Sequence, residues 1–150
     1  MKILLAYDGS RCAEAALEEV LQRPWPAGTE VRIVTAVERP AYAPSVGGIE
    51  GLATFGERLG AELREEAYRQ IQRALERFAG RAELKSSYEL RDGDAKSALL
   101  AAIREWKPDL VVAGSHGKTP LERFLLGSVS HALVSHAPCN VEIVKASTAA

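Results

Sequence analysis

The sequence predicts an α/β domain built on a single open, five-stranded parallel sheet with helices on both faces. Five short apolar runs of strand length alternate with segments in which apolar residues recur every three or four positions. Strands that alternate with helices form right-handed βαβ units, so the strands of such a chain run parallel. The length of 150 residues matches one domain, which we expect to span residues 1–150, and an apolar content of 47% is ordinary for a globular protein.

The charge balance and the apolar pattern exclude several classes of protein. Nineteen Lys and Arg residues against 20 Asp and Glu residues give a net charge of −1, which does not indicate a nucleic-acid partner. No apolar run approaches the roughly 20 residues of a membrane span, and residues 1–8 turn polar too early for a signal peptide. We therefore expect a cytoplasmic protein without a membrane partner. Cys12 and Cys139 lie far apart and predict neither a disulfide nor a metal site.

The first two strands are expected over residues 3–7 and 31–37, where apolar and β-branched residues concentrate. Between them, Ser10 is placed to cap a helix. The apolar stripe of this helix consists of Ala13, Ala16, Leu17, Val20 and Leu21. Two prolines and a glycine within residues 23–28 end it.

Residues 38–56 are rich in glycine and proline, which predicts a long flexible loop. Helical periodicity resumes at Glu57 and ends at Gly80. The apolar stripe of this second helix consists of Leu59, Leu63, Ala67, Ile71, Ala74, Leu75 and Phe78.

The second half of the chain continues the alternation. Residues 83–90 form a polar strand, which suits a sheet edge, and Asp94 is placed to cap the next helix. Residues 109–114 are apolar enough for a strand that is buried on both faces. The helices and the strand that complete the pattern are expected over residues 95–106, 128–135 and 141–144.

Two glycine-containing turns follow the fourth strand and indicate a phosphate site. Gly114 and Gly117 stand in the first turn, and after nine further residues Gly127 and Ser128 open a helix. Glycines let a backbone approach a phosphate closely, and free N–H groups at a helix N-terminus attract anions. Ligands of open parallel sheets bind beyond the carboxyl ends of the strands, which is where both turns fall.

Other polar residues near these turns leave alternatives open. Asp8 follows the first strand, where its carboxylate either caps the turn at Ser10 or contacts a ligand. His116 could be a phosphate partner, a general base or an exposed loop residue. Neither Ser10 nor Ser115 stands in the G-x-S-x-G pattern of a nucleophile elbow. We therefore assign no catalytic residue and no metal ligand.

The spacing G-x2-G-x9-G-S, here Gly114, Gly117, Gly127 and Ser128, resembles the ATP-binding subgroup of the universal stress protein family. Further segments similar to that family are residues 6–10, 125–130 and 137–139. The resemblance implies a Rossmann-like sheet of the adenine nucleotide alpha hydrolase type, with strand order 3-2-1-4-5. It also implies a homodimer and the ligand ATP, with Mg or Mn bound through the phosphates.

The resemblance further implies a role for each residue of the site. Asp8 would approach the ribose or phosphate side of the nucleotide, with Ala6 and Tyr7 along the same edge. The family's ATP binders often carry Pro or Thr at this edge, so Tyr7 could narrow the pocket or stack on the ligand. The residues implied to hold the adenine, the ribose and the phosphates are, in that order, Ala36; Ala113 and Gly114; and Gly117, Gly127, Ser128, Val129 and Ser130.

These expectations favour a binding protein over an enzyme. The first hypothesis is an ATP-binding stress-response protein that acts as a nucleotide-dependent switch or as a dimer that binds an unknown protein partner. The alternative is a slow ATPase or nucleotidyl-transfer enzyme at the same site, and a third hypothesis is an interaction protein whose site stays empty in the cell. The dimer is expected to pair residues 141–144 with their symmetry mates. Glu142 would then face its own copy or be balanced by Lys145.

Overall fold

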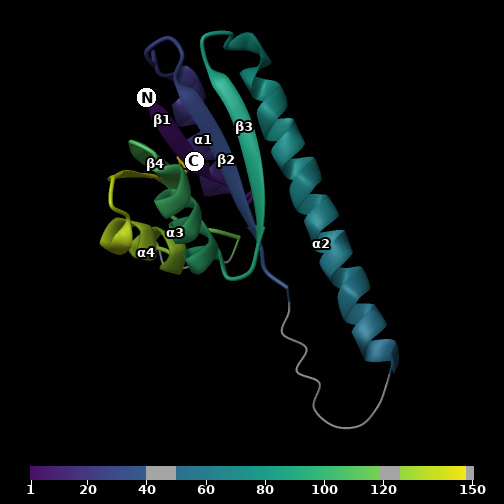
Figure 1. Ribbon diagram of the computed structural model, residues 1–150. Helices are drawn as coiled ribbons and strands as arrows, with labels where there is room; N and C mark the ends of the chain where they lie inside the picture. Colours follow the sequence, from purple (N-terminus) through teal and green to yellow (C-terminus); the bar gives the residue numbers. More distant parts are fainter. Residues whose placement is uncertain (40–49, 119–125, 148–150) are drawn as a thin grey trace.

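The computed structural model describes residues 1–39, 50–118 and 126–147. Its sheet is parallel and five-stranded, in the order β3-β2-β1-β4-β5, which confirms the predicted fold class and strand order (Figure 1). The strands are β1 (Lys2–Ala6), β2 (Glu30–Val37), β3 (Lys85–Asp92), β4 (Leu110–Gly114) and β5 (Asn140–Val144). The helices are α1 (Arg11–Gln22), α2 (Glu50–Glu76), the short 3₁₀ helix η1 (Arg77–Gly80), α3 (Ala95–Trp106) and α4 (Ser128–His136).

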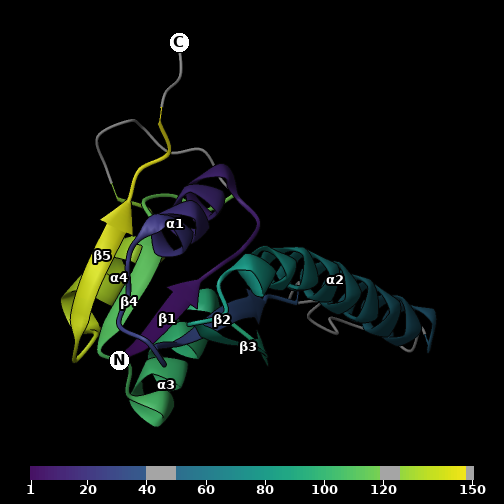
Figure 2. The same ribbon diagram turned by 90° about the horizontal axis from the view of Figure 1, so that it is seen from above.

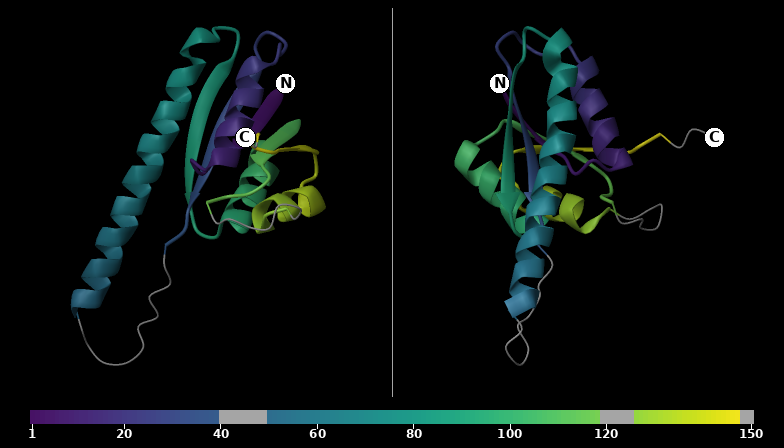
Figure 3. Two further views of the ribbon diagram at one scale, coloured as in Figure 1. Left: turned by 180° about the vertical axis from the view of Figure 1, so that it is seen from behind. Right: turned by 90° about the vertical axis from the view of Figure 1, so that its right-hand side faces the viewer.

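Helices cover both faces of the sheet and enclose two apolar layers (Figures 2 and 3). Successive side chains of β1 point to opposite faces, so Ile3 and Leu5 enter one layer and Leu4 enters the other. The first layer packs against α1 and α2 through Leu17, Val20 and Ile71, among others. The second packs against α3 and α4 through Leu99, Ile103 and Leu133, among others. The central strand therefore anchors both layers.

Local capping signals set the helix boundaries that the sequence predicts. The side chain of Ser10 accepts a hydrogen bond from the N–H of Ala13 at 3.2 Å, which fixes the start of α1. Asp94 accepts one from the N–H of Ser97 at 3.0 Å at the start of α3. Lys107 takes a left-handed conformation, with φ of 52°, and ends α3 directly before Pro108. Both predicted caps are confirmed.

The helix α2 begins earlier than its sequence suggests. It starts at Glu50, so the expectation of a loop over residues 38–56 is wrong over residues 50–56. Residues 38–39 belong to no helix or strand, and residues 40–49 lie outside the described residues. A glycine costs a helix only about 1 kcal/mol relative to alanine, so Gly56 does not interrupt a helix anchored further along. Arg64 ties α2 to the edge of the sheet by an ion pair with Asp92, at 3.0 Å. Figure 1 shows α2 continuing past the carboxyl end of β3.

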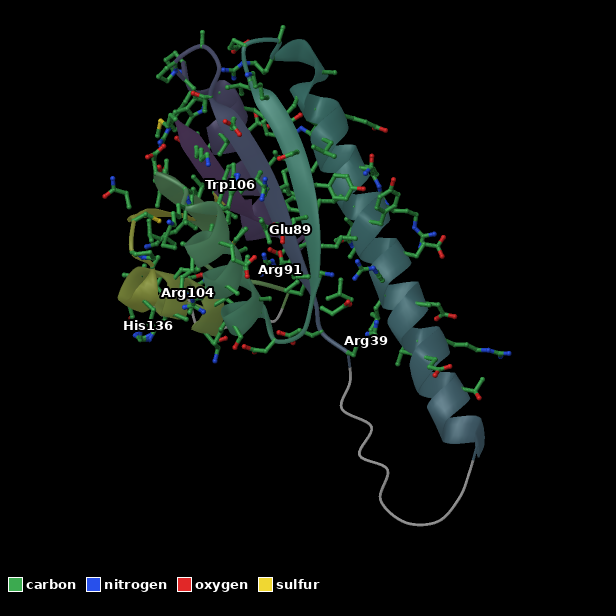
Figure 4. All side chains as sticks on the ribbon, in the orientation of Figure 1. Arg39, Glu89, Arg91, Arg104, Trp106 and His136 are labelled. Atoms are coloured by element: carbon green, nitrogen blue, oxygen red, sulfur yellow. The ribbon has the colours of Figure 1, made fainter. Side chains whose placement is uncertain are left out.

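Part of the surface of the edge strand β3 is covered by ion pairs and not by a helix (Figure 4), which explains why this strand is polar. Glu89 pairs with Arg91 at 2.6 Å and with Arg32 of the neighbouring strand at 3.5 Å. The guanidinium of Arg32 also lies 4.5 Å from the ring centroid of Trp106, at the end of α3. The predicted position of residues 83–90 at a sheet edge is confirmed by the strand order.

At the opposite edge, Glu142 of β5 has a partner that the sequence did not indicate. Arg23, just after α1, donates to Glu142 at 2.7 Å and also pairs with Glu19 at 2.7 Å. Within one chain Glu142 is therefore balanced by Arg23, a partner that neither of the two expected arrangements in the dimer included. The two paired residues are 119 positions apart, and packing of α1 beside β5 brings them together. Across the described ranges, no helix is long and apolar enough to span a bilayer.

Close packing of α1 on β4 depends on the absence of a side chain at Gly114. A Cβ atom there would lie 2.6 Å from the carbonyl carbon of Cys12 and 2.7 Å from its Cβ. Both atoms belong to the first turn of α1, so a side chain at residue 114 would force that turn away from β4. The glycine that the motif places at 114 is therefore required by packing, whatever it does for a ligand.

We predict that Gly114→Ala lowers the free energy of unfolding by about 1–3 kcal/mol, the usual cost of overpacking a core. Urea denaturation followed by circular dichroism measures the change. Gly80→Ala is the matched control, because a Cβ at Gly80 would meet no atom within 4 Å. Equal stability of the two variants would show that α1 does not depend on Gly114.

Candidate functional site

A cavity of about 410 Å³ lies at the carboxyl ends of β1 and β2, between α2 and the start of α4. A second cavity of about 90 Å³ adjoins it and shares several lining residues. The residues predicted from sequence that line the larger cavity are Asp8, Ala36, Gly117, Gly127, Ser128, Val129 and Ser130. The others, Ala6, Tyr7, Ala113 and Gly114, line the smaller one. The fold therefore brings all the predicted site residues together.

Hydrogen bonds join the two glycine turns around the carbonyl group of Ser115. That carbonyl accepts from the N–H of Gly127 at 2.8 Å and from the hydroxyl of Ser130 at 3.1 Å. The hydroxyl of Ser130 also lies 2.7 Å from the carbonyl oxygen of Gly114. The buried hydroxyl of Ser130 therefore joins the two turns, which leaves the first backbone N–H groups of α4 and the exposed hydroxyl of Ser128 as donors for an anion.

Gly127 allows the turns to meet and leaves the start of α4 open. A Cβ atom at Gly127 would lie 3.2 Å from the carbonyl oxygen of Ser115, tighter than ordinary contact. Gly127 is the N-cap of α4 and makes no side-chain capping bond. The first N–H groups of a helix have no intrahelical partner, so those of Ser128 and Val129 face the region that the cavity occupies.

Asp8 caps the turn at Ser10, the first of the two roles that its sequence position left open, and it also borders the larger cavity. One carboxylate oxygen accepts from the N–H of Ser10 at 2.9 Å and so closes the turn before α1. The other lies 2.9 Å from the position that a Cβ atom would take on Gly117. The carboxylate is therefore held in place by the turn while it borders the larger cavity.

Tyr7 is directed into the core beneath α1 and leaves little of its ring to stack on a ligand. Its side chain is 5% exposed, and its hydroxyl donates to Glu14. Burial and this hydrogen bond raise the pKa of Tyr7 well above its usual value. Its carbonyl oxygen accepts from the hydroxyl of Thr35 at 2.6 Å, which joins the ends of β1 and β2.

The sequence analysis missed one wall of the larger cavity, formed by the middle of α2. Gln70 donates to Glu66 at 3.0 Å, and its side-chain oxygen fills the space beside Gly9, which has a φ of 74°. Hydrogen bonds from Arg69 and Gln70 lower the pKa of Glu66. The local signal for this wall was the Asp-Gly-Ser turn at residues 8–10. This turn predicts a backbone conformation that needs glycine, but it does not predict that α2 packs against it.

The charged groups that border the larger cavity are mostly acidic. They are the carboxylates of Asp8, Glu38 and Glu66 and the ammonium group of Lys118. Glu38 is engaged by the N–H of Ala95 at 2.8 Å. In the part of the chain that the structure describes, no three His, Cys, Asp or Glu residues are grouped to hold a metal ion. A polyphosphate here would need a cation, and that cation would take most of its ligands from the phosphates.

The fold and these turns define an α/β protein with a glycine-lined site at the point where the strand order reverses. The chain belongs to the universal stress protein family, whose model matches residues 1–145. It is 30% identical over 145 residues to universal stress protein MJ0531 of Methanocaldococcus jannaschii, an alignment that covers 96% of this chain and 81% of the relative.

Solved structures agree with this fold. The protein MJ0577 aligns with a TM-score of 0.84 and 24% identity over 99% of this chain and 97% of its own. UspA from Lactobacillus plantarum aligns with a TM-score of 0.80 and 23% identity, over 96% and 97%. A family protein from Arabidopsis thaliana, solved with AMP bound, aligns at 0.67 with 15% identity, over 99% and 93%. A universal stress protein in complex with cAMP aligns at 0.62 with 22% identity, over 98% of each chain.

We predict that Ser130→Ala destabilises the fold by about 1–2 kcal/mol, because two buried carbonyl groups lose a hydrogen-bond donor. Ser128→Ala is the matched control: Ser128 is exposed in the same turn of α4, so its loss should change stability by no more than about 0.5 kcal/mol. Thermal unfolding and urea denaturation of both variants test the difference. An unchanged Ser130→Ala variant would contradict the joining role of this hydroxyl.

Proposed function

We propose that the protein binds ATP, with Mg or Mn held through the phosphates, and acts in the stress response as a nucleotide-dependent switch or partner-binding dimer. The observation that carries the proposal is the pair of glycine turns, joined at Ser115, that borders the larger cavity opposite Asp8. The structures of family proteins with AMP or cAMP support an adenine nucleotide as the ligand class.

The residues of the site fit such a ligand. A Cβ at Gly117 would lie 2.9 Å from the carboxylate of Asp8, and one at Gly127 would lie 3.2 Å from the carbonyl of Ser115, so both glycines are needed for the turns to close at the edge of the cavity. The N–H groups at the start of α4 would hold phosphate oxygens, as helix N-termini do in other nucleotide sites. Ala36, at the end of β2, would border the adenine.

The hydrogen bonds made by the acidic groups around the cavity favour nucleotide binding over nucleotide hydrolysis. Fast phosphoryl transfer needs a positioned base and a metal-holding acid. Glu38 and Glu66 border the cavity, but Glu38 is held by the N–H of Ala95 and Glu66 by Arg69 and Gln70. Among the described lining residues this leaves Asp8 as the carboxylate with an oxygen directed at the glycine turns.

The direct test is to purify the protein, release bound small molecules by heating, and identify adenine nucleotide by chromatography. The protein is then incubated with ATP and magnesium. Bound ATP that survives for hours supports a binding protein, whereas many turnovers would support the ATPase alternative. A protein that neither retains nor binds a nucleotide would contradict the proposal.

We predict that Gly117→Val abolishes ATP binding in a folded protein. The valine side chain would collide with the carboxylate of Asp8, 2.9 Å from the Cβ position, and would fill the part of the larger cavity that these two residues border. Isothermal titration calorimetry measures the affinity, and circular dichroism checks the fold. Gly80→Val is the control, because Gly80 lies outside both cavities and has open space around it. An unchanged affinity in folded Gly117→Val would show that the nucleotide binds elsewhere.

We predict that Asp8→Ala weakens ATP binding by a few-fold to tens-fold, equivalent to about 1–2 kcal/mol for a hydrogen bond to a charged group. Asp8→Asn separates the two roles of this residue, because its amide oxygen still accepts from Ser10 while the negative charge is lost. Weak binding together with wild-type stability in Asp8→Asn supports ligand contact. Wild-type affinity in both variants would leave Asp8 a purely structural residue.

We propose that the homodimer forms through β5, whose outer edge is open in the described chain. The carbonyl of Val144 accepts from the N–H of Ser115 at 2.8 Å. The backbone groups of alternate residues point to the same side of a parallel strand, so those of Val144 and Glu142 point toward β4. Val141 and Ile143 therefore direct their N–H groups outward. Arg23 balances the charge of Glu142, which removes much of the repulsion between two copies of this edge.

We predict that Ile143→Pro gives monomers, because proline removes an outward N–H group and leaves the bonds between β4 and β5 in place. Light scattering at micromolar concentration measures the mass. The control is Lys145→Ala, which changes a charge just past the strand but keeps every backbone donor. A wild-type protein that is monomeric at this concentration would overturn the dimer.

A further inference from the structure

Three polar side chains lie in a row beside the glycine turns, namely the thiol of Cys12, the hydroxyl of Ser115 and the imidazole of His116. Cys12, in the first turn of α1, has its sulfur 3.6 Å from the hydroxyl oxygen of Ser115. That oxygen lies 3.1 Å from Nδ1 of His116. α1 packs on β4 and β5, as the ribbon in Figure 2 shows, and this packing places Cys12 beside the residues that follow β4.

An independent observation concerns the far side of the imidazole. Nε2 of His116 is buried and has no hydrogen-bond partner among the described residues. Buried polar atoms in folded proteins are normally paired, so an unpaired imidazole nitrogen at such a site indicates a functional demand on the ring. Nδ1 lies within hydrogen-bond distance of the Ser115 hydroxyl, so the ring can take a proton that Cys12 releases through that hydroxyl, after which the Ser115 O–H donates to the sulfur.

The surroundings of the sulfur favour its ionised form. Desolvation by burial raises the pKa of Cys12, and the nearby Asp8 adds to this. Hydrogen bonds from Ser115 and from the backbone N–H groups of Ala146 and His116 outweigh both, so the pKa lies below its usual value. The donor at Ala146 is kept in place by Arg11, which donates to the carbonyl of Ser147 at 3.0 Å.

We propose that Cys12 is a modification site: a thiol that reacts with hydrogen peroxide and that Ser115 and His116 activate. The thiol proton passes through Ser115 to His116, and the sulfur then attacks one peroxide oxygen. The S–O bond forms as the O–O bond breaks, so the sulfur is oxidised to sulfenic acid and the peroxide is reduced. The departing hydroxide takes the proton back from His116 and leaves as water.

Oxidation of Cys12 would affect the candidate nucleotide site through Ser115. This consequence rests on the proposed function. The hydroxyl of Ser115 contacts Cys12, while its carbonyl accepts from Gly127 and Ser130. An oxygen added to the sulfur needs the space beside the Ser115 hydroxyl, so it would shift the residue on which both glycine turns close. Oxidised protein should therefore bind ATP several-fold more weakly.

The second cysteine provides an internal reference for the test. Cys12 and Cys139 are both half-buried, but burial and the charge of Asp109 raise the pKa of Cys139. The intact protein is treated with limiting iodoacetamide, or with hydrogen peroxide and dimedone, and each cysteine is followed by peptide mass spectrometry. We expect Cys12 to react at least tenfold faster than Cys139. Equal rates, or faster reaction at Cys139, would overturn the proposal.

Two further measurements test the activating groups and the link to the nucleotide. Ser115→Ala should slow the reaction at Cys12 several-fold and leave Cys139 unchanged; an unchanged rate at Cys12 would overturn activation through Ser115. Saturating ATP should also slow the reaction at Cys12. If calorimetry shows that ATP binds and the rate is unchanged, the link is wrong. If calorimetry shows no ATP binding, the proposed function fails, and the comparison of Cys12 with Cys139 still decides whether Cys12 is reactive.

Discussion

The close approach of the first turn of α1 to the end of β4 is the constraint on which the rest of the site depends. It is possible because Gly114 has no side chain: a Cβ there would lie 2.6 Å from the backbone of Cys12. Once α1 is seated, Ser10 and Asp8 fix the turn before it, and Ser115 and His116 emerge directly beneath it. The absence of a side chain at Gly114 thus sets how closely α1 approaches β4, and this approach determines where the polar groups at this end of the sheet can lie.

Ser115 then connects regions that lie far apart in the sequence. Its N–H extends the bonding of β4 to β5 by donating to Val144, its carbonyl closes the two glycine turns, and its hydroxyl lies between Cys12 and His116. The bonding of β4 to β5, the two glycine turns and the thiol therefore meet at one buried residue. A change at any one of them can reach the others without a large movement, because packed interiors transmit small displacements.

The sequence predicts those parts of the fold that local chemistry decides. Ser10 and Asp94 cap their helices, the polar β3 lies at an edge, and the glycine spacing brings the site residues together. It fails where the outcome depends on distant partners. The start of α2 was missed because packing outweighs the small cost of Gly56, and the partner of Glu142 was missed because Arg23 reaches it only in the folded chain. The wall at Glu66 and Gln70 was missed for the same reason.

That wall changes how the candidate site must work. Asp8, Glu38 and Glu66 border the larger cavity, and Lys118 and the Arg69 partner of Glu66 offset only part of their charge, so a bare polyphosphate would be repelled there. Backbone N–H groups at α4 attract the phosphates, but their partial charges do not balance three carboxylates. A nucleotide and a divalent cation would therefore enter as one complex of lower negative charge, and the affinity for either alone should be much lower. Occupancy of the site would then respond to the concentration of both, which suits a protein that binds and senses a nucleotide more than one that consumes it.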